Sequence, residues 1–190
     1  RRDVAAAKRF VDQMESASIA SRPLDRQFCL IARAWLALER GTSAEAIEAA
    51  RSALAVAEPL GVPFWQSICR TPLILALINA KRFDEAKRVI DGARALVRGT
   101  CLLHSDSLVS ALDALLHLRE GRDRETKDAL HDLFSKVRLR EHGSILDRLH
   151  MVMPELCAFA WTAGIETEIV ADLVHRLGWH PPCPETENWP

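Results

Sequence analysis

Apolar residues recur along most of the chain three and four positions apart, which is the spacing of an amphipathic helix. No segment has a convincing strand pattern. Glycines or short polar clusters break the apolar stretches, and helices are expected to stop there. The sequence therefore predicts an all-α chain, with helices over residues 2–17, 23–40, 43–59, 63–81, 83–98, 103–120, 122–140, 144–163 and 165–178.

Prolines fall at two kinds of position in this pattern. Pro23 and Pro63 stand at the start of predicted helices, where the missing N–H is harmless. Pro72 and Pro154 fall inside predicted helices, where each removes a backbone hydrogen bond. We expect a bend at each of these two residues.

The chain resembles itself when it is shifted by about 40 residues. The stretches `LALERGTSAEAIEAA`, `LALINAKRFDEAKRVI` and `LLHLREGRDRETKDAL` then align, and Leu38, Ile78 and Leu118 superpose. Each unit consists of a long apolar-rich helix, a short break and a second amphipathic helix. Ser43 and Asp84 are the expected N-caps of two second helices. Small residues follow where paired helices approach closely, at Ala46, Ala53, Ala86 and Ala93.

This arrangement of small residues resembles tetratricopeptide (TPR) repeats, most closely in `KRFDEAKRVIDGARAL`. The period of about 40 exceeds the standard 34 and is similar to the repeat region of MalT-like regulators. Those proteins join an ATP-binding module to a repeat sensor and a DNA-binding domain. The resemblance implies a right-handed superhelix of antiparallel helix pairs over residues 1–178, with the first repeat truncated.

The last residues, `GIETEIVADLVHRLGWHPPCPETENWP`, resemble the junction that precedes a winged-helix, BTAD-type module in relatives of these regulators. Residues 179–190 are accordingly predicted to be a Pro-rich linker to a further domain, with Trp189 lacking a partner unless it folds back on the last helices. An ordinary capped C-terminus is an alternative. A metal site of His175, His180 and Cys183 is another, although structural zinc normally has four ligands.

Composition and charge argue against several classes of function. A formal net charge of −1 and a pI near 6.7 provide no basic field for nucleic acid or membranes, and acidic neighbours dilute the basic stretch `SKVRLREH`. Five cysteines without a C-x-x-C pair indicate reduced thiols and a cytoplasmic protein. No apolar run approaches the roughly 18 residues of a membrane span. No catalytic, cofactor or metal motif is present, so we expect no enzyme activity.

The superhelix predicts a concave face lined by the first helix of each pair. In one register the lining residues are Phe28, Ile31, Trp35, Leu38, Glu39, Ile68, Thr71, Leu75, Asn79, Leu108, Leu115 and Arg119. A second register exposes Arg33, Arg70, Asp113 and His117, a set suited to an anionic or peptide ligand. Alternatively, Trp35 and the aliphatic residues form the core between repeats. The candidate partner-binding residues are Arg33, Trp35, Glu39, Arg70, Asn79, Asp113, His117 and Arg119.

Two functions are consistent with these observations. The first is a non-catalytic segment for effector sensing and protein–protein interaction within a multidomain bacterial transcriptional regulator. The second is a free-standing TPR adaptor that docks protein or peptide partners, with self-association possible. A protein, a peptide or a small effector would bind on the concave face, and we expect no direct contact with nucleic acid or membrane.

Overall fold

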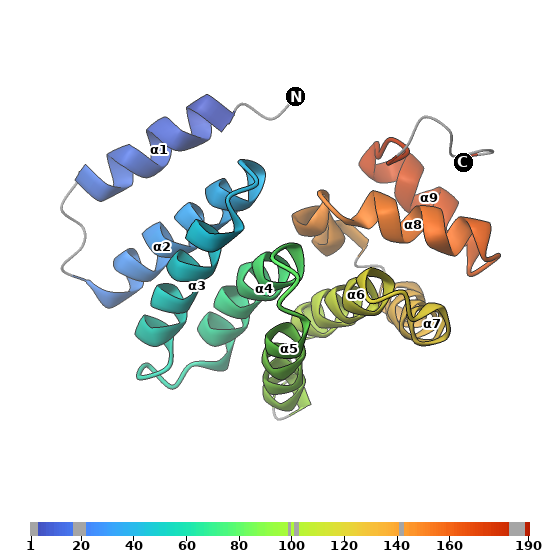
Figure 1. Ribbon diagram of the computed structural model, residues 1–190, viewed down its shortest axis with the longest axis horizontal. Coiled ribbons are helices and arrows are strands. Elements are labelled where there is room, and N and C mark those ends of the chain that lie inside the picture. Colours follow the sequence, from blue (N-terminus) through green and yellow to red (C-terminus); the bar gives the residue numbers. More distant parts are fainter. Residues whose placement is uncertain (1–3, 17–21, 99, 101–102, 141–142, 183–188) are drawn as a thin grey trace. The chain divides into compact units, whose positions relative to one another are not determined.

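The computed structural model describes residues 4–16, 22–98, 100, 103–140, 143–182 and 189–190. These residues form helices and turns, with no strand among them. The helices are α1 (Val4–Ser16), α2 (Pro23–Glu39), α3 (Ser43–Ala57), α4 (Pro63–Asn79), α5 (Phe83–Arg98), α6 (Leu103–Arg119), α7 (Asp123–Arg140), the 3₁₀ helix η2 (Gly143–Leu149), α8 (Met153–Thr162) and α9 (Thr167–Leu177), as Figure 1 shows. The prediction of an all-α chain is confirmed.

Most predicted helix boundaries agree with the structure to within two residues, because Gly and Pro mark them. Pro23 and Pro63 are the first residues of α2 and α4, as expected. Pro72 lies inside α4. The predicted N-caps are wrong by one or two positions: Thr42 precedes α3, whose first residue is Ser43, and α5 begins at Phe83, before Asp84.

The predicted single helix over residues 144–163 is wrong. The structure has η2 over Gly143–Leu149, a turn, and then α8 over Met153–Thr162. Buried residues here lie three positions apart, at Leu146, Leu149 and Val152, and three is the period of a 3₁₀ helix. Pro154 lies in the first turn of α8, so it does not interrupt a helix and does not bend one.

One type of helix end recurs along the chain. Gly41, Lys81 and Gly121, which are 40 residues apart, all adopt the left-handed conformation, with φ of 73°, 56° and 71°. At each end, the backbone N–H of the residue after the left-handed one donates to the carbonyl five positions before it, which is the Schellman closure of a helix. These bonds are Thr42 N to Ala37 O (2.9 Å), Arg82 N to Leu77 O (2.9 Å) and Arg122 N to His117 O (3.0 Å).

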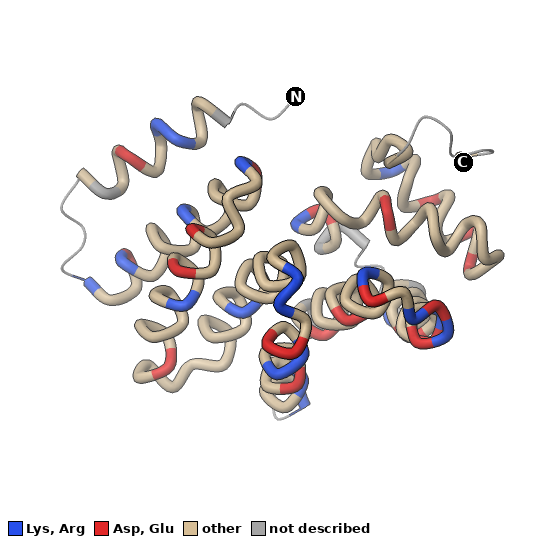
Figure 2. The backbone as a smooth tube through the Cα atoms, viewed as in Figure 1, with Lys and Arg blue, Asp and Glu red and all other residues tan. Residues whose placement is uncertain are grey.

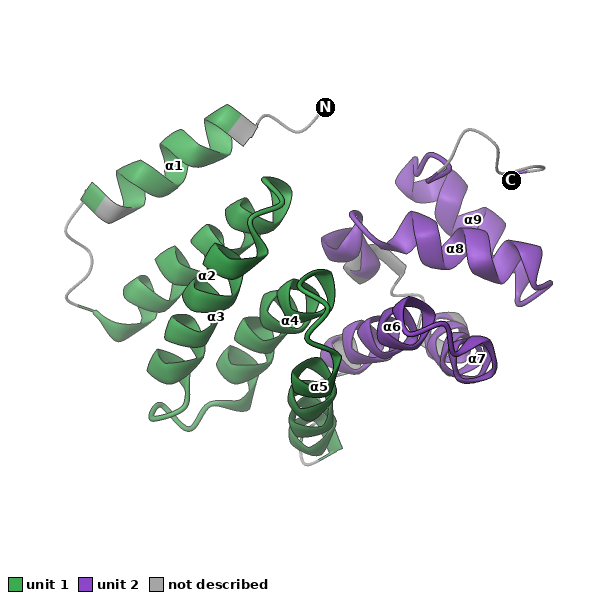
Figure 3. Cartoon of the chain, viewed as in Figure 1, with its two compact units in different colours: residues 1–101 green, residues 102–190 purple. Residues whose placement is uncertain are grey.

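The chain divides into two compact units, residues 1–101 and residues 102–190 (Figure 3). In the first unit α2 packs on α3, α3 on α4 and α4 on α5, while α1 packs on α2. The small residues expected at close helix contacts are buried, which confirms that prediction. They are Ala46, Ala53, Ala86 and Ala93.

Gln27 joins α2 to α4 within the first unit. Its side chain is buried, and the Nε2 amide donates to the Trp65 carbonyl at 3.2 Å and to Cys69 Sγ at 3.3 Å. Burial raises the pKa of the Cys69 thiol to about 11, so the thiol stays protonated at neutral pH. This polar contact joins two helices that are one predicted repeat apart in the sequence.

The second unit contains α6, α7, η2, α8 and α9, with a largely aliphatic core. A polar cluster ties α6 to α7: Lys136 Nζ lies 3.1 Å from the Asp106 carboxylate, 2.8 Å from Ser110 Oγ and 2.6 Å from the Asp132 carboxylate. Arg119 of α6 pairs with Glu155 of α8 at 2.6 Å.

Two tryptophans that follow α9, Trp179 and Trp189, are joined by a hydrogen bond. Trp179 is buried, and its backbone N–H donates to the Val174 carbonyl at 3.1 Å, closing α9. The Trp189 indole N–H donates to the Trp179 carbonyl at 3.3 Å. Trp189 therefore has a partner on this unit, as the fold-back alternative predicted.

In the part of the chain that the structure describes, every helix is too short or too polar to cross a membrane.

Candidate interaction surface

Apolar side chains are exposed where α2 and α4 begin. Leu24, Phe28 and Phe64 have 39%, 43% and 47% of their surface exposed, and Trp65 is half-buried beside them. We call these four residues the aromatic patch. Leu60 and Val62, also exposed, lie in the loop that leads into α4.

The sequence places these side chains through the prolines that start the two helices. Pro23 and Pro63 occupy the first helical position, so Leu24 and Phe64 lie in first turns, where neighbouring side chains cover them little. Phe28 follows Leu24 by one turn of α2 and lies on the same face of that helix. The result is an apolar surface at the same end of two helices of one unit.

Aromatic contacts hold the patch together. The ring centroids of Phe28 and Trp65 are 5.3 Å apart at an interplanar angle of 82°, and those of Phe64 and Trp65 are 4.9 Å apart at 64°. Both are edge-to-face contacts, the arrangement that aromatic quadrupoles favour. Trp65 also packs against the buried cluster of Ile31, Ala53, Ala57 and Cys69, which anchors the exposed rings to the core.

One of the two helices that carry the patch, α4, has little charge. Figure 2 shows charged residues spread along α5 and α7, whereas α4 is mostly uncharged. Its one arginine, Arg70, is engaged locally, with its guanidinium 3.2 Å from the Gln66 amide oxygen and 3.8 Å from the Glu58 carboxylate. The exposed Phe64 ring therefore has no charged neighbour in the first turn of its own helix.

The candidate residues of the first unit do not form one site. Trp35 is half-buried against the same cluster as Trp65, so it belongs largely to the core between α2 and α4. Arg33 is exposed and lines a pocket with residues of α1. Glu39 and Asn79 are exposed at the ends of α2 and α4.

The candidates of the second unit lie along α6. Asp113 is buried and its carboxylate lies 3.4 Å from His117 Nε2, while His117 Nδ1 lies 4.0 Å from the Glu120 carboxylate. Arg119 is held by its ion pair with Glu155. Asp113 and His117 are therefore neighbours, and Arg119 joins α6 to α8.

Most aliphatic residues predicted to line a concave face are buried, so they form core. They are Ile31, Leu38, Leu75, Leu108 and Leu115, and Thr71 is buried with them. Phe28 remains exposed, as predicted. The sequence interpretation missed Leu24 and Phe64. The sequence feature that could have identified them is an apolar residue directly after the proline that starts a helix. It occurs in `RPLD` and in `VPFW`, 40 residues apart.

Reactive groups are sparse among the described residues. Burial raises the pKa of the Cys157 thiol to about 12, and the Cys69 thiol is similarly protonated. No group of three or more His, Cys, Asp or Glu in the described ranges could hold a metal ion. His175 and His180 are exposed, and Cys183 lies outside the described residues.

Comparison with protein-family models, with curated proteins and with solved structures finds no match to this chain.

Proposed function

We propose that this chain is a non-catalytic, TPR-like repeat domain that binds a protein partner through the aromatic patch. The observation that supports this function best is the exposure of Leu24, Phe28 and Phe64 around a core-anchored Trp65. In the proposed architecture α2–α3, α4–α5 and α6–α7 are successive pairs of a right-handed superhelix with a period of 40 residues. The recurrence of one helix closure at Gly41, Lys81 and Gly121 supports that period.

The patch suits a polypeptide segment that presents apolar side chains. Aromatic residues dominate the energetics of protein interfaces because they bury a large area with few rotatable bonds. Contiguous apolar surface is also costly to leave in water, so it commonly marks a contact site. The edge-to-face contacts with Trp65 preorganise Phe28 and Phe64, which lowers the entropy lost on binding.

For the larger context we propose a cytoplasmic, multidomain transcriptional regulator of the MalT-like class. The sequence resemblance of the repeats, and of the segment after α9, supports this proposal. The alternative is a free-standing adaptor. The flanking coding sequence distinguishes the two, since a regulator requires a phosphate-binding loop upstream and a winged helix downstream, and an adaptor requires neither.

The binding proposal is tested by selecting displayed peptides on the purified protein. We expect enriched peptides to carry aromatic or aliphatic anchors and to lose most of their affinity for the Phe64→Ser protein. The Phe10→Ser protein is the matched control, because Phe10 is 62% exposed on α1 and lies outside the patch. Thermal melts establish that both variants fold. Equal loss of binding in the two variants, or selected peptides without apolar anchors, would contradict the proposal.

A further inference from the structure

The two compact units carry opposite net charges. Residues 1–101 contain sixteen Lys and Arg and eleven Asp and Glu, which gives a formal net charge of +5. Residues 102–190 contain nine Lys and Arg and fifteen Asp and Glu, which gives a formal net charge of −6. The chain as a whole is nearly neutral, but the unit that carries the aromatic patch is basic.

Two exposed arginines flank the aromatic patch on α2. Arg22 is the N-cap of this helix and Arg26 follows one turn later, with Leu24 between them in the sequence. Neither guanidinium forms an ion pair with a residue that the structure describes. Asp25 supplies one negative charge here, so this end of α2 has a formal net charge of +1. A segment bound at the patch therefore meets an excess of positive charge at its edge.

A second copy of this chain is a poor occupant of the patch. Contact between the patches of two copies would bring together two units that each carry a charge of +5, and like charges oppose such a contact. The second unit is acidic, but no large apolar side chain is exposed in its described part. It therefore offers carboxylates without the apolar anchor that an interface of this kind needs.

We propose that the aromatic patch binds an acidic polypeptide segment of a partner protein, in which Asp or Glu residues flank aromatic or aliphatic anchors. This inference rests on the proposed function and adds the charge of the partner. The anchors pack against Phe28, Phe64 and Trp65, while the carboxylates lie in the positive potential of the first unit. Charges at the rim of an interface act mainly on the association rate, so Arg22 and Arg26 steer the partner towards the patch.

Two synthetic peptides with the same apolar anchors test this charge preference on the whole chain. One peptide has flanking glutamates and the other has flanking lysines. At low ionic strength the glutamate peptide should bind about tenfold more tightly, as fluorescence anisotropy of the labelled peptides can measure. Added salt should reduce this difference, because the screening length falls from about 10 Å at 0.1 M to about 3 Å at 1 M.

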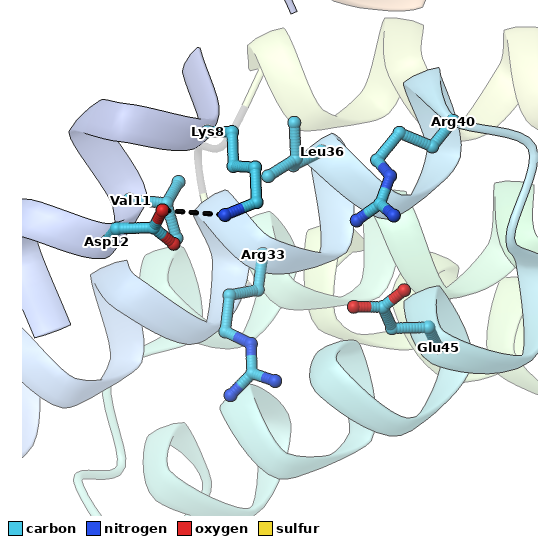
Figure 4. A pocket seen from close by; sticks show the side chains of 7 residues that line it. All are labelled: Lys8, Val11, Asp12, Arg33, Leu36, Arg40 and Glu45. Carbon is cyan, nitrogen blue, oxygen red and sulfur yellow. Dashed lines mark hydrogen bonds and ion pairs between the residues drawn. The ribbon is translucent and has the colours of Figure 1, made fainter. Parts of the chain in front are cut away.

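Charge reversal beside the patch tests the role of the two arginines. The double variant Arg22→Glu and Arg26→Glu should slow association of the glutamate peptide about tenfold and leave its dissociation rate nearly unchanged, in stopped-flow measurements. The matched control is Arg40→Glu with Lys87→Glu, which changes the net charge equally. Arg40 follows the last residue of α2, about 25 Å from the first, and lines a separate pocket there (Figure 4). Lys87 is exposed on α5. The control should slow association much less, and thermal melts establish that each variant folds.

Several results would overturn the proposal. Equal affinity for the two peptides, lost for both in Phe64→Ser, would leave the proposed function in place and remove the acidic partner. Binding of neither peptide would overturn both. Equal slowing in the two double variants would remove the steering role of Arg22 and Arg26. Tighter binding to vesicles of phosphatidylserine and phosphatidylcholine than to the glutamate peptide, or a dimer in sedimentation that Phe64→Ser abolishes, would assign the patch to a membrane or to a second copy.

Discussion

Lys81 holds a backbone conformation that glycine holds at the two matching helix ends, Gly41 and Gly121. A left-handed residue with a Cβ is strained, whereas glycine is not. We expect Lys81→Gly to raise the free energy of unfolding by about 0.5 to 1 kcal/mol. The substitution relieves the backbone strain, and glycine's greater entropy in the unfolded chain offsets part of that gain. Urea denaturation measures this change.

Gly121→Ala provides the control for this prediction. A Cβ added at Gly121 would have no heavy atom within 4 Å, so its cost comes from the backbone conformation alone. The variant should lose about 1 kcal/mol. A destabilised Lys81→Gly protein would mean that the lysine side chain contributes more than its backbone strain costs.

Glu85 gives the chain a predictable response to acid. The hydrogen bond from Arg82, at 2.6 Å, lowers the pKa of the Glu85 carboxyl from its ordinary value of 4.5, and Arg51 of α3 lies 2.6 Å away on the other side. A lowered folded-state pKa means that this stabilisation is present above about pH 4.5 and is lost as the pH falls through the folded-state pKa.

The wild-type protein should therefore lose its stability advantage over Glu85→Gln as the pH falls below about 4.5. Chemical denaturation at a series of pH values measures the difference. Glu48→Gln, which removes an exposed carboxyl of α3, is the comparison variant. If the difference in unfolding free energy between the wild type and Glu85→Gln did not change with pH, the ion pairs of Glu85 would not contribute to stability.

Close packing between α4 and α5 depends on small side chains. Ala86 of α5 is fully buried, so Ala86→Leu should overfill the contact and lower the free energy of unfolding by about 1 to 3 kcal/mol. Ala95 is exposed on the same helix, and Ala95→Leu should change stability by less than about 0.5 kcal/mol. Equal effects in the two variants would contradict the assigned face of α5.

Helix positions were predictable from sequence because local signals determine them. Gly41, Gly121, Pro23 and Pro63 end or begin helices for reasons contained in a few residues. The break between η2 and α8 was not predictable in this way. Apolar residues continue through it at helical spacing, and Pro154 is compatible with either a bend or a new first turn, so tertiary packing decides.

The candidate site was predicted less well, since it depends on how helices face one another. A register error of one residue moves a side chain from core to surface, which is why Leu75 and Leu115 were expected in a groove and are buried. Phe28, which was expected in the same groove, is exposed. Phe64 was missed because the apolar pattern of a helix is the same whether a residue in its first turn is covered or exposed.

At the scale of the whole molecule, the two units should be separable. The first unit contains its own buried cluster of Ile31, Ala53, Ala57 and Cys69, contributed by α2, α3 and α4. We expect residues 1–101 expressed alone to be strongly helical and to melt cooperatively, as circular dichroism can measure.

A shorter fragment, residues 1–80, is the control for this prediction. It lacks α5 and so uncovers part of α4, whose residues 71–78 are all buried. It should melt at a lower temperature than residues 1–101. A coil-like spectrum for residues 1–101 would show that the first unit needs the second in order to fold.

The hydrogen bond from Gln27 to Cys69 spans only 42 positions, and the pairing of Arg119 with Glu155 spans 36. Each contact joins helices about 40 residues apart along the chain, so it can form soon after the second helix has been made. A ribosome adding about 5 to 20 residues per second needs only about 2 to 8 seconds to supply the next 40 residues. Within the first unit, α2 and α3 can thus be covered by α4 soon after they emerge, so their apolar surface is exposed to solvent only briefly during synthesis.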